Sequence, residues 1–452
     1  MHINPGMSAL FTDLYELTML QAYYAEGMTA PATFELFFRQ LPENRSYVMA
    51  AGLDDVLSYI ENLRFTDDDL TWLGALGLFS DSLIEQLRGF RFTGDVYAVP
   101  EGTIVFENEP VLQVIAPLPE AQLIETYALN QTHLQSVCAT KAARIVTAAQ
   151  GRTVVVDFGS RRSHGTDAAL KVARTSYMAG AAGTSNVLAS RLYDIPAFGT
   201  MAHSYIQAHT DEQVAFRAFT HQFPGTTLLV DTYDTLEGIR QIIGLAAELG
   251  EAFKVSAVRL DSGDLLALSR RARQALDEAG LSHIKIFVSS GLNEVKIASL
   301  LEDKAPIDGF GVGTELAVSK DAPDIDFAYK LVEYDGKPRM KLSSSKTSPP
   351  GRKQVFRSYQ AGQMVGDVIG HFDEVLEDEF LLQTVMKNGR RLDAARVSLQ
   401  AAREHARAQL AALPAHLKRV ETIADAYKVE FSAALASTTI QLRQSLQQRT
   451  FL

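Results

Sequence analysis

The feature that most constrains the fold is a repeat of about 30 residues between residues 153 and 332, in which β-branched runs alternate with amphipathic helical stretches. The runs are Thr153–Asp157, Thr226–Asp231, Val255–Asp261, Ile284–Ser290 and Ile307–Gly311. The helical stretches between the later runs cover residues 234–249, 264–279 and 293–302. Because the runs are apolar almost throughout, we predict successive strand–helix units around a parallel sheet that helices cover.

Each run ends in a polar residue or a glycine at its C-terminal edge. These residues are Asp157, Asp231, Asp261, Ser290 and Gly311. In a (β/α) barrel such edges gather at one face, where the loops after the strands build the active site. An Asp or Ser after a strand also caps the next helix, which explains any single one equally well. All five together favour an active site at this face.

The flanks show other patterns. Residues 9–120 combine a helix beginning near Thr12 with alternating strands at 93–105 and 110–115, as in an antiparallel α/β layer. Residues 340–390 are rich in strand patterns, and helices are expected at 395–418 and 431–448. A chain of 452 residues exceeds the size at which one hydrophobic core stops growing, so we expect two domains or one elaborated barrel.

Composition excludes several classes of protein. The formal net charge of −11 argues against non-specific nucleic-acid binding, which needs an excess of Lys and Arg. We expect no membrane span and no signal peptide, because long apolar runs and a basic-then-apolar N-terminus are both missing, and hence a cytoplasmic protein. Cys138 is the only cysteine, so a disulfide framework is excluded, and its apolar neighbours favour a buried structural thiol.

Residues 157–163 (DFGSRRS) place Arg161 and Arg162 in a turn directly after a strand. Arginine forms bidentate bonds to carboxylate or phosphate, so this turn is a candidate anion site, although a solvated loop would also explain it. On pattern alone Phe158 is more often a core residue than a ring-stacking one.

His203 lies in residues 199–204 (GTMAHS), after the apolar segment 195–198. We expect it at a strand exit, beside small residues that leave room for a ligand. A lone histidine is usually structural, so spacing alone does not establish a catalytic role. Its spacing to His209 does not fit a metalloprotease helix, and we discount zinc.

Three later segments place charged residues or glycine turns at the ends of predicted strands. Residues 259–264 (RLDSGD) place Arg259 and the carboxylates Asp261 and Asp264 at a strand end. Residues 289–294 (SSGLNE) and 309–315 (GFGVGTE) are glycine turns between a strand and a helical pattern, where exposed amide groups suit a phosphate. The second turn is not a dinucleotide fingerprint, because its spacing and its place in the chain are wrong.

In this order, the segments resemble the nicotinate phosphoribosyltransferase family of type II phosphoribosyltransferases. The resemblance begins at residues 12–19 (TDLYELTM) and covers about residues 8–400. The other matching segments are 37–39 (FFR), 101–103 (EGT), 157–163, 199–204, 259–264, 289–294, 311–316 (GVGTEL) and 346–357 (KTSPPGRKQVFR).

The resemblance implies an α/β fold with an irregular (β/α) barrel domain and an α/β sandwich domain built from N-terminal and C-terminal segments. It also implies a homodimer with shared active sites. We therefore assign residues 1–125 to the N-terminal part of the sandwich and residues 126–340 to the barrel with the active site. Residues 341–452 supply a basic loop, strands and C-terminal helices that complete the sandwich.

The resemblance also implies roles for individual residues, with His203 as the phosphorylated histidine. Tyr15 of the neighbouring subunit and Phe158 would contact the pyridine ring, and Arg161 and Thr200 the nicotinate carboxylate. Arg259 and Asp261 would contact the ribosyl portion, and Gly291 and Thr314 the 5′-phosphate. Ser185, Asp231, Ser290 and Gly313 are included in the binding set. Arg39 and the basic loop from Lys346 to Lys353 are candidates for pyrophosphate or ATP phosphates, although a charge run is more often a solvated face.

The implied reaction joins nicotinate to the phosphoribosyl group of phosphoribosyl pyrophosphate in NAD salvage, with Mg²⁺ on the pyrophosphate and ATP hydrolysis coupled through His203. No Walker A pattern is present, so the sequence does not locate ATP. One alternative is a nicotinamide or quinolinate enzyme. A nicotinamide enzyme should offer a carboxylate to the amide where this chain has Ser185, and quinolinate enzymes are much shorter. The other is a catalytically silent nucleotide-binding barrel, against which the presence of His203 and Asp261 argues.

Overall fold

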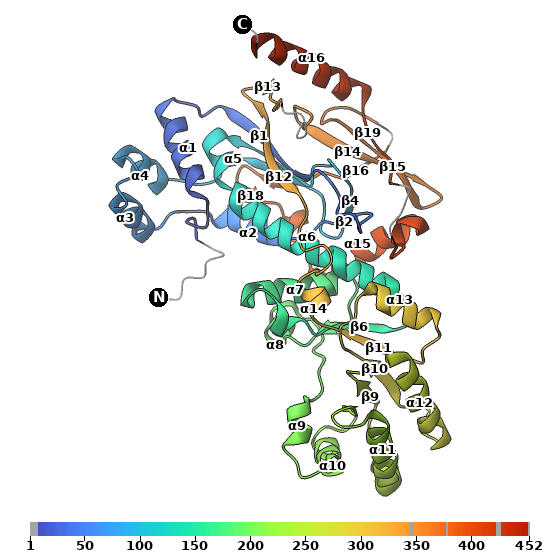
Figure 1. Cartoon of the computed structure of the whole chain (residues 1–452). Coiled ribbons are helices and arrows are strands. Elements are labelled where there is room, and N and C mark those ends of the chain that lie inside the picture. The colour runs from blue at the N-terminus through green and yellow to red at the C-terminus, as the bar shows by residue number, and fades with distance from the viewer. Residues whose placement is uncertain (1–7, 343–347, 377, 422–425, 451–452) are drawn as a thin grey trace. The chain divides into compact units, whose positions relative to one another are not determined.

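The structure is a computed structural model that describes residues 8–342, 348–376, 378–421 and 426–450 (Figure 1). The chain divides into two compact units. The first, which we call the sandwich unit, contains residues 1–137, 324–418 and 422–452, and the second, the barrel unit, contains residues 138–323 and 419–421. The division thus falls at 137/138 and 323/324, whereas the sequence boundaries were set at 125/126 and 340/341.

The barrel unit is built on a six-stranded parallel sheet with the order β7-β6-β11-β10-β9-β8. Its strands are β6 (Val154–Asp157), β7 (Gly183–Thr184), β8 (Thr227–Leu229), β9 (Ala257–Leu260), β10 (Lys285–Val288) and β11 (Gly309–Val312). Each of the five predicted apolar runs overlaps one of these strands, and the predicted parallel α/β arrangement is confirmed. The sheet curves as a half-barrel with β7 and β8 at its edges.

Helices follow the strands of the barrel unit, as the repeat predicts (Figure 1). They are α7 (Thr166–Met178), α8 (Val187–Tyr193), α9 (His203–Gln207), α10 (Glu212–Gln222), α11 (Thr235–Leu249), α12 (Leu265–Glu278), α13 (Glu294–Glu302) and α14 (Thr314–Ala317), with 3₁₀ turns at Ser160–Arg162 and Gly250–Ala252. The side chains of Asp234, Asp264 and Asn293 accept bonds from the first turns of α11, α12 and α13. These caps fix where the helices begin.

The sandwich unit interleaves N-terminal and C-terminal strands in a seven-stranded sheet with the order β13-β12-β1-β5-β3-β17-β18. Its N-terminal strands are β1 (Pro31–Phe38), β3 (Asp95–Ala98) and β5 (Leu112–Pro117), and its C-terminal strands are β12 (Phe327–Tyr334), β13 (Lys337–Pro338), β17 (Gln383–Lys387) and β18 (Arg390–Arg391). A four-stranded sheet contains β16 (Glu379–Phe380), β14 (Lys353–Gln360), β15 (Gln363–His371) and β19 (Val429–Phe431), and a two-stranded one contains β2 (Val48–Met49) and β4 (Ile104–Val105). This confirms a sandwich made from both ends of the chain.

The helices of the sandwich unit are α1 (Leu14–Ala25), α2 (Leu53–Asn62), α3 (Asp67–Ala75), α4 (Asp81–Arg88), α5 (Leu118–Leu123), α15 (Leu399–Ala412) and α16 (Ala433–Thr450). Further 3₁₀ turns lie at Asp393–Ala395 and Ala415–Lys418. The chain passes from the sandwich unit to the barrel unit within α6 (Glu125–Ala148). A continuous apolar core fills the sandwich unit, and it includes Leu20 and Phe38 from the N-terminal segment and Tyr329 and Met386 from the C-terminal segment.

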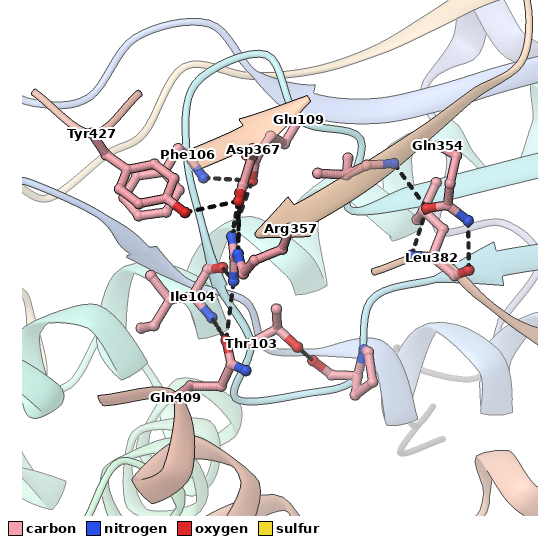
Figure 2. A network of polar contacts seen from close by, with 12 residues as sticks. Thr103, Ile104, Phe106, Glu109, Gln354, Arg357, Asp367, Leu382, Gln409 and Tyr427 are labelled. Carbon is pink, nitrogen blue, oxygen red and sulfur yellow. Dashed lines mark hydrogen bonds and ion pairs between the residues drawn. The ribbon is translucent and has the colours of Figure 1, made fainter. Parts of the chain in front are cut away.

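A buried polar network around Arg357 joins the two ends of the chain inside the sandwich unit (Figure 2). The Arg357 guanidinium on β14 donates to both carboxylate oxygens of Asp367 on β15, with Nη2 at 2.5 Å from Oδ2, and to the carbonyl of Ile104 at 2.8 Å. The Tyr427 hydroxyl donates to Asp367 at 2.8 Å. Burial, together with the charge of Asp367, raises the pKa of Glu109 well above its ordinary value. The rise favours the protonated form of Glu109, which lies 3.8 Å from the Arg357 guanidinium.

The basic loop lies partly outside the described residues, which include neither Lys346 nor its neighbours at 343–347. Lys353 is buried, and its ammonium lies 2.7 Å from the carboxylate of Glu35 and donates to the carbonyls of Pro349 and Gly351. Lys353 therefore anchors the end of the loop to β1. Its ammonium is fully engaged within the protein and does not project toward solvent.

Candidate active site

A cleft of about 170 Å³ lies at the carboxyl ends of strands β6, β9, β10 and β11 in the barrel unit. It is lined by Phe158, Arg161, Arg162, Arg259, Asp261, Ser289, Ser290, Gly291, Leu292, Gly311, Gly313, Thr314 and Glu315. Eight of the residues that the resemblance places in the substrate site therefore line one cleft. They meet there because the carboxyl ends of parallel strands share one edge of the sheet.

The arginine turn after β6 is held by Asp157, which is fully buried. Its carboxylate accepts bonds from the Gly159 amide and the Thr184 hydroxyl, both at 2.7 Å. Burial raises the pKa of Asp157, and those two bonds partly oppose the rise. Gly159 is required sterically, because a Cβ there would lie 2.7 Å from the Cβ of Ala317. The turn thus presents Arg161 at the cleft on a fixed backbone.

Arg161 and Arg162 are both exposed, and within the described residues neither guanidinium has an ion-pair partner. The two acidic side chains that line the cleft, Asp261 and Glu315, are each paired with a cation. Asp261 is paired with Arg259 at 3.0 Å, and Glu315 lies 3.3 Å from Lys320. The unpaired positive charge at the cleft is therefore available to an anion.

Arg259 and Asp261 form the centre of the cleft with Ser289. The Arg259 guanidinium donates to the Ser289 hydroxyl at 2.9 Å and lies 5.5 Å from the ring centroid of Phe158, while the Ser289 hydroxyl donates to Asp261. Burial alone would raise the pKa of Asp261, but the Ser289 bond and the Arg259 charge outweigh it, so that the pKa is lowered. Asp261 is therefore a carboxylate at neutral pH.

The acidic residues after the strands fall into two groups: some cap the next helix, and others form hydrogen bonds at the cleft. Asp264 caps α12, as does Asp234 for α11. Asp231 caps no helix, and its Oδ2 accepts the Asp261 amide at 2.8 Å and the Ser262 hydroxyl at 2.5 Å. Its Oδ1 is buried and finds no hydrogen-bond partner among the described residues. Asp231 thus fixes the backbone at Asp261 from the neighbouring strand end.

His203 lies beside this cluster, with Nε2 at 3.7 Å from Oδ2 of Asp261 and Nδ1 at 3.1 Å from the Thr232 hydroxyl. Its side chain is 40% exposed, so the ring is accessible. The expectation that it follows a strand is wrong, because residues 195–198 form only a single bridge at Ala197 and His203 is the first residue of α9. Pro196 lacks the amide that a longer ladder would use.

Two loops with unusual backbones close the cleft on the side of β10 and β11. Ser290 and Gly291 have φ values of 98° and 54°, and the Lys296 ammonium donates to the Gly291 carbonyl at 2.8 Å. A left-handed non-glycine residue such as Ser290 is strained, and such strain gathers at functional sites. Gly313 and Thr314 follow β11 at the beginning of α14. Residues of both loops line the cleft.

Several residues of the expected set lie outside the cleft. The Thr200 hydroxyl donates to the carbonyl of Thr227 on β8, and Ser185 donates its amide to the Asp157 carbonyl after β7. Tyr15, on α1, and Arg39, after β1, belong to the sandwich unit. There Arg39 lines a separate cavity of about 350 Å³ that also contains Lys330, Arg339 and Lys341.

The sequence analysis missed Thr184 and Ser289 as supports of the cleft, although both lie in segments that it quoted or adjoined. Their function depends on a side-chain contact with a carboxylate on another strand, which no local pattern shows.

Cys138 is buried as expected, and burial raises the pKa of its thiol to about 12. Among the described residues no group of three or more His, Cys, Asp or Glu side chains could hold a metal ion. No described helix is both long and apolar enough to cross a membrane.

Exposed arginines that have no ion-pair partner among the described residues, together with glycine-containing loops at the carboxyl ends of parallel strands, are typical of an α/β enzyme for a phosphorylated, anionic substrate. Comparison with known proteins identifies the family within this class of enzymes. Models of the N-terminal domain, the core and the C-terminal domain of nicotinate phosphoribosyltransferases match residues 10–132, 153–362 and 376–439. The chain belongs to the nicotinate phosphoribosyltransferase family.

Relatives support this membership over nearly the whole chain. The chain is 57% identical to the nicotinate phosphoribosyltransferase pncB2 of Mycobacterium tuberculosis, over 98% of this chain and 96% of the relative. It is 44% identical to the nicotinate phosphoribosyltransferase of Bacillus subtilis, over 82% and 78%. The crystal structure of human nicotinic acid phosphoribosyltransferase superposes with a TM-score of 0.85 at 27% identity, covering 95% of this chain and 99% of that one.

Proposed function

We propose that this protein transfers the phosphoribosyl group of phosphoribosyl pyrophosphate to the ring nitrogen of nicotinate, releasing pyrophosphate and forming nicotinate mononucleotide for NAD salvage. The observation that carries the proposal is the cleft itself. It combines two exposed arginines, an Arg259–Asp261 pair and two glycine-containing loops in a chain that is 57% identical to a nicotinate phosphoribosyltransferase.

The cleft suits the charges of that reaction. The anomeric carbon gains positive charge as pyrophosphate leaves, and Asp261, ionised because Ser289 and Arg259 lower its pKa, supplies a negative charge. Phe158 and Arg161 would face the pyridine ring and its carboxylate. The loops at Ser290–Gly291 and Gly313–Thr314 would hold the 5′-phosphate.

The charge of the cleft favours nicotinate over nicotinamide. A nicotinamide site needs an acceptor for the amide protons, and the obvious carboxylate near Ser185 is Asp157. Both oxygens of Asp157 already accept bonds, from Gly159 and Thr184, and the side chain is fully buried. Exposed Arg161 and Arg162 fit the carboxylate of nicotinate instead.

ATP enters the proposal through His203. An imidazole nitrogen of His203 would take the γ-phosphoryl group, ADP would leave, and later hydrolysis would return the free ring and inorganic phosphate. The accessible ring and its place 3.7 Å from Asp261 support this role. Phosphorylation would thereby change the charge beside the transferring sugar.

Two further elements belong to the same proposal. Mg²⁺ commonly uses one or two carboxylates together with substrate phosphates, which fits Asp261 and Asp231, and when bound it would neutralise the leaving pyrophosphate. Arg39, with Lys330, Arg339 and Lys341 in its cavity, would bind pyrophosphate or ATP phosphates. A homodimer with shared active sites and a cytoplasmic location stay predictions.

A single assay tests the proposal. Mononucleotide formation is measured with nicotinate, nicotinamide and quinolinate, each with Mg²⁺ and with or without ATP, and again after chelation of the metal. We expect product from nicotinate, a rise with ATP and loss on chelation. Product from nicotinamide or quinolinate alone would favour another pyridine phosphoribosyltransferase. No product from any of them would favour a silent nucleotide-binding barrel.

A further inference from the structure

Lys141 is a buried cation that the reaction proposed above does not use. It lies on α6, its side chain is 1% exposed, and it does not line the cleft. Its ammonium lies 2.5 Å from Oε2 of Glu294 and 2.6 Å from Oδ1 of Asp321. One lysine therefore binds two carboxylates from distant parts of the barrel unit.

The two carboxylates belong to the segments that follow neighbouring strands. Glu294 is the first residue of α13, directly after the loop that contains Ser290 and Gly291. Asp321 follows α14, which begins at Thr314 directly after Gly313. The Lys141 ammonium thus ties the end of one cleft loop to the segment beyond the other.

Arg144 completes the network one turn further along α6. Its Nε lies 3.0 Å from Oε1 of Glu294, and its Nη2 donates to the carbonyl of Val420 at 2.9 Å. Both oxygens of the Glu294 carboxylate are therefore bound, one by each cation. Burial alone would raise the pKa of Glu294, but the charge and bond of Lys141 lower it.

The backbone of these loops needs such support. Ser290 has a φ of 98° and Ser319, two residues before Asp321, has a φ of 40°, both in the left-handed region that costs energy for a residue with a side chain. A strained loop keeps its conformation only where its surroundings fix it. An unpaired buried charge is costly, so the two ion pairs of Lys141 oppose movement of Glu294 and Asp321 away from it.

We propose that Lys141 is a positioning residue for the 5′-phosphate of the phosphoribosyl substrate. It holds the loop at 289–293 and the loop at 313–315 at the separation that lets both meet one phosphate group. Arg144 orients Glu294 for this contact. The inference rests on the proposed function for the identity of the substrate, and on the two ion pairs for the geometry.

The proposal is tested with Lys141→Met, which keeps length and removes the charge, and Lys141→Arg, which restores it. Lys141→Met should raise the KM for phosphoribosyl pyrophosphate about tenfold or more, as loop misplacement does, with the KM for nicotinate within about twofold. Binding of ribose 5-phosphate, measured by calorimetry, should weaken in parallel. Lys141→Arg should recover part of both.

The matched control is Arg273→Met. Arg273 ties α12 to the opposite end of β10 through the Ile284 carbonyl at 2.7 Å, and it lies away from the cleft loops. This variant should lower the melting temperature and leave both KM values unchanged. If Lys141→Met does not fold, Asp321→Asn replaces it, because Asp321 is 32% exposed and its loss is milder.

An unchanged KM for phosphoribosyl pyrophosphate and unchanged ribose 5-phosphate binding in the folded variants would overturn the inference and leave the network a structural one. Failure of the proposed function looks different. In that case the wild-type protein forms no mononucleotide, while calorimetry with ribose 5-phosphate still shows whether the loops bind a sugar phosphate and whether Lys141 matters to it.

Discussion

Nε2 of His203 lies 3.7 Å from Oδ2 of Asp261, so that the residue proposed to carry a phosphoryl group adjoins the carboxylate proposed to face the reacting sugar. Asp261 contacts Arg259 through its other oxygen at 3.0 Å. A phosphoryl group on His203 would therefore place negative charge beside Asp261, whose other oxygen is already paired with the Arg259 guanidinium. This arrangement gives a physical route by which ATP could alter substrate binding.

The first prediction concerns Asp261→Asn, which should lower kcat by about 100-fold or more because it removes a charge beside a developing cation. Steady-state assays and thermal melting measure turnover and folding separately. Asp264→Asn is the control, since Asp264 caps α12 and Asn caps a helix equally well. Near-normal turnover of a folded Asp261→Asn protein would remove Asp261 from the reaction.

The second prediction is that His203 takes the phosphoryl group of ATP. Radiolabelled ATP should give an acid-labile, base-stable adduct, and His203→Ala should lose both the label and the stimulation by ATP. A slower ATP-independent transfer should persist, because the carboxylates of the cleft remain. Peptide mapping is needed to exclude His164 and His209, of which His209 already bonds the Tyr205 carbonyl through Nδ1. A label that persists in His203→Ala would refute the role.

Much of the barrel unit could be predicted from the sequence because its signals are local. The apolar runs and the caps Asp234, Asp264 and Asn293 lie within a few residues of the elements that they define. The rule that the carboxyl ends of parallel strands meet was enough to gather Arg161, Arg259 and Thr314 in one cleft.

The buried ion pairs could not be predicted, because their partners are far apart in the chain. Lys141 meets Glu294 across 153 positions, and Lys353 meets Glu35 across 318. In the sequence Lys353 looks like part of a solvated basic run, and only burial shows that its charge is used internally. The one hint in the sequence is that Lys141 and Arg144 lie three residues apart in the largely apolar segment 138–148.

The third prediction concerns the Arg357 network. Arg357→Met should lower the free energy of unfolding by about 3–5 kcal/mol, because it leaves the buried Asp367 carboxylate without its cation. Denaturant melts measure the loss. Arg396→Met is the control, since Arg396 pairs with Glu61 at 3.0 Å on the surface and exposed pairs contribute about 1 kcal/mol at most. Equal losses in the two variants would show that the buried network contributes no special stability.

The fourth prediction uses Glu16, which is buried on α1 beside Tyr15. Burial raises the pKa of Glu16 from 4.5 to about 7, and the bond that Gln122 donates at 3.0 Å opposes the rise only in part. The folded protein therefore binds a proton that the unfolded chain has already lost. Between pH 4.5 and 7 this group lowers stability as pH rises, by about 3 kcal/mol in total at 1.36 kcal/mol per pKa unit.

Glu16→Gln removes that titration. Its stability relative to the wild type should be lowest near pH 4.5, should increase toward pH 7 and should then level off, as followed by denaturant melts across the range. Glu26→Gln, at the exposed end of the same helix, should show no such trend. A constant difference between Glu16→Gln and wild type at all pH values would show that Glu16 ionises normally.

The last prediction tests whether two chains share one active site. Tyr15 is 46% exposed on α1 of the sandwich unit, whereas Asp261 lines the cleft of the barrel unit. If Tyr15 serves the cleft of a neighbouring subunit, Tyr15→Ala should raise the KM for nicotinate, and mixing it with Asp261→Asn should restore activity. A mixed dimer then contains one cleft free of both changes, so recovery should approach about one quarter of the wild-type turnover if chains exchange at random. Mixed dimers are verified by two affinity tags. Full exchange without recovered turnover would place Tyr15 in the cleft of its own chain or in none.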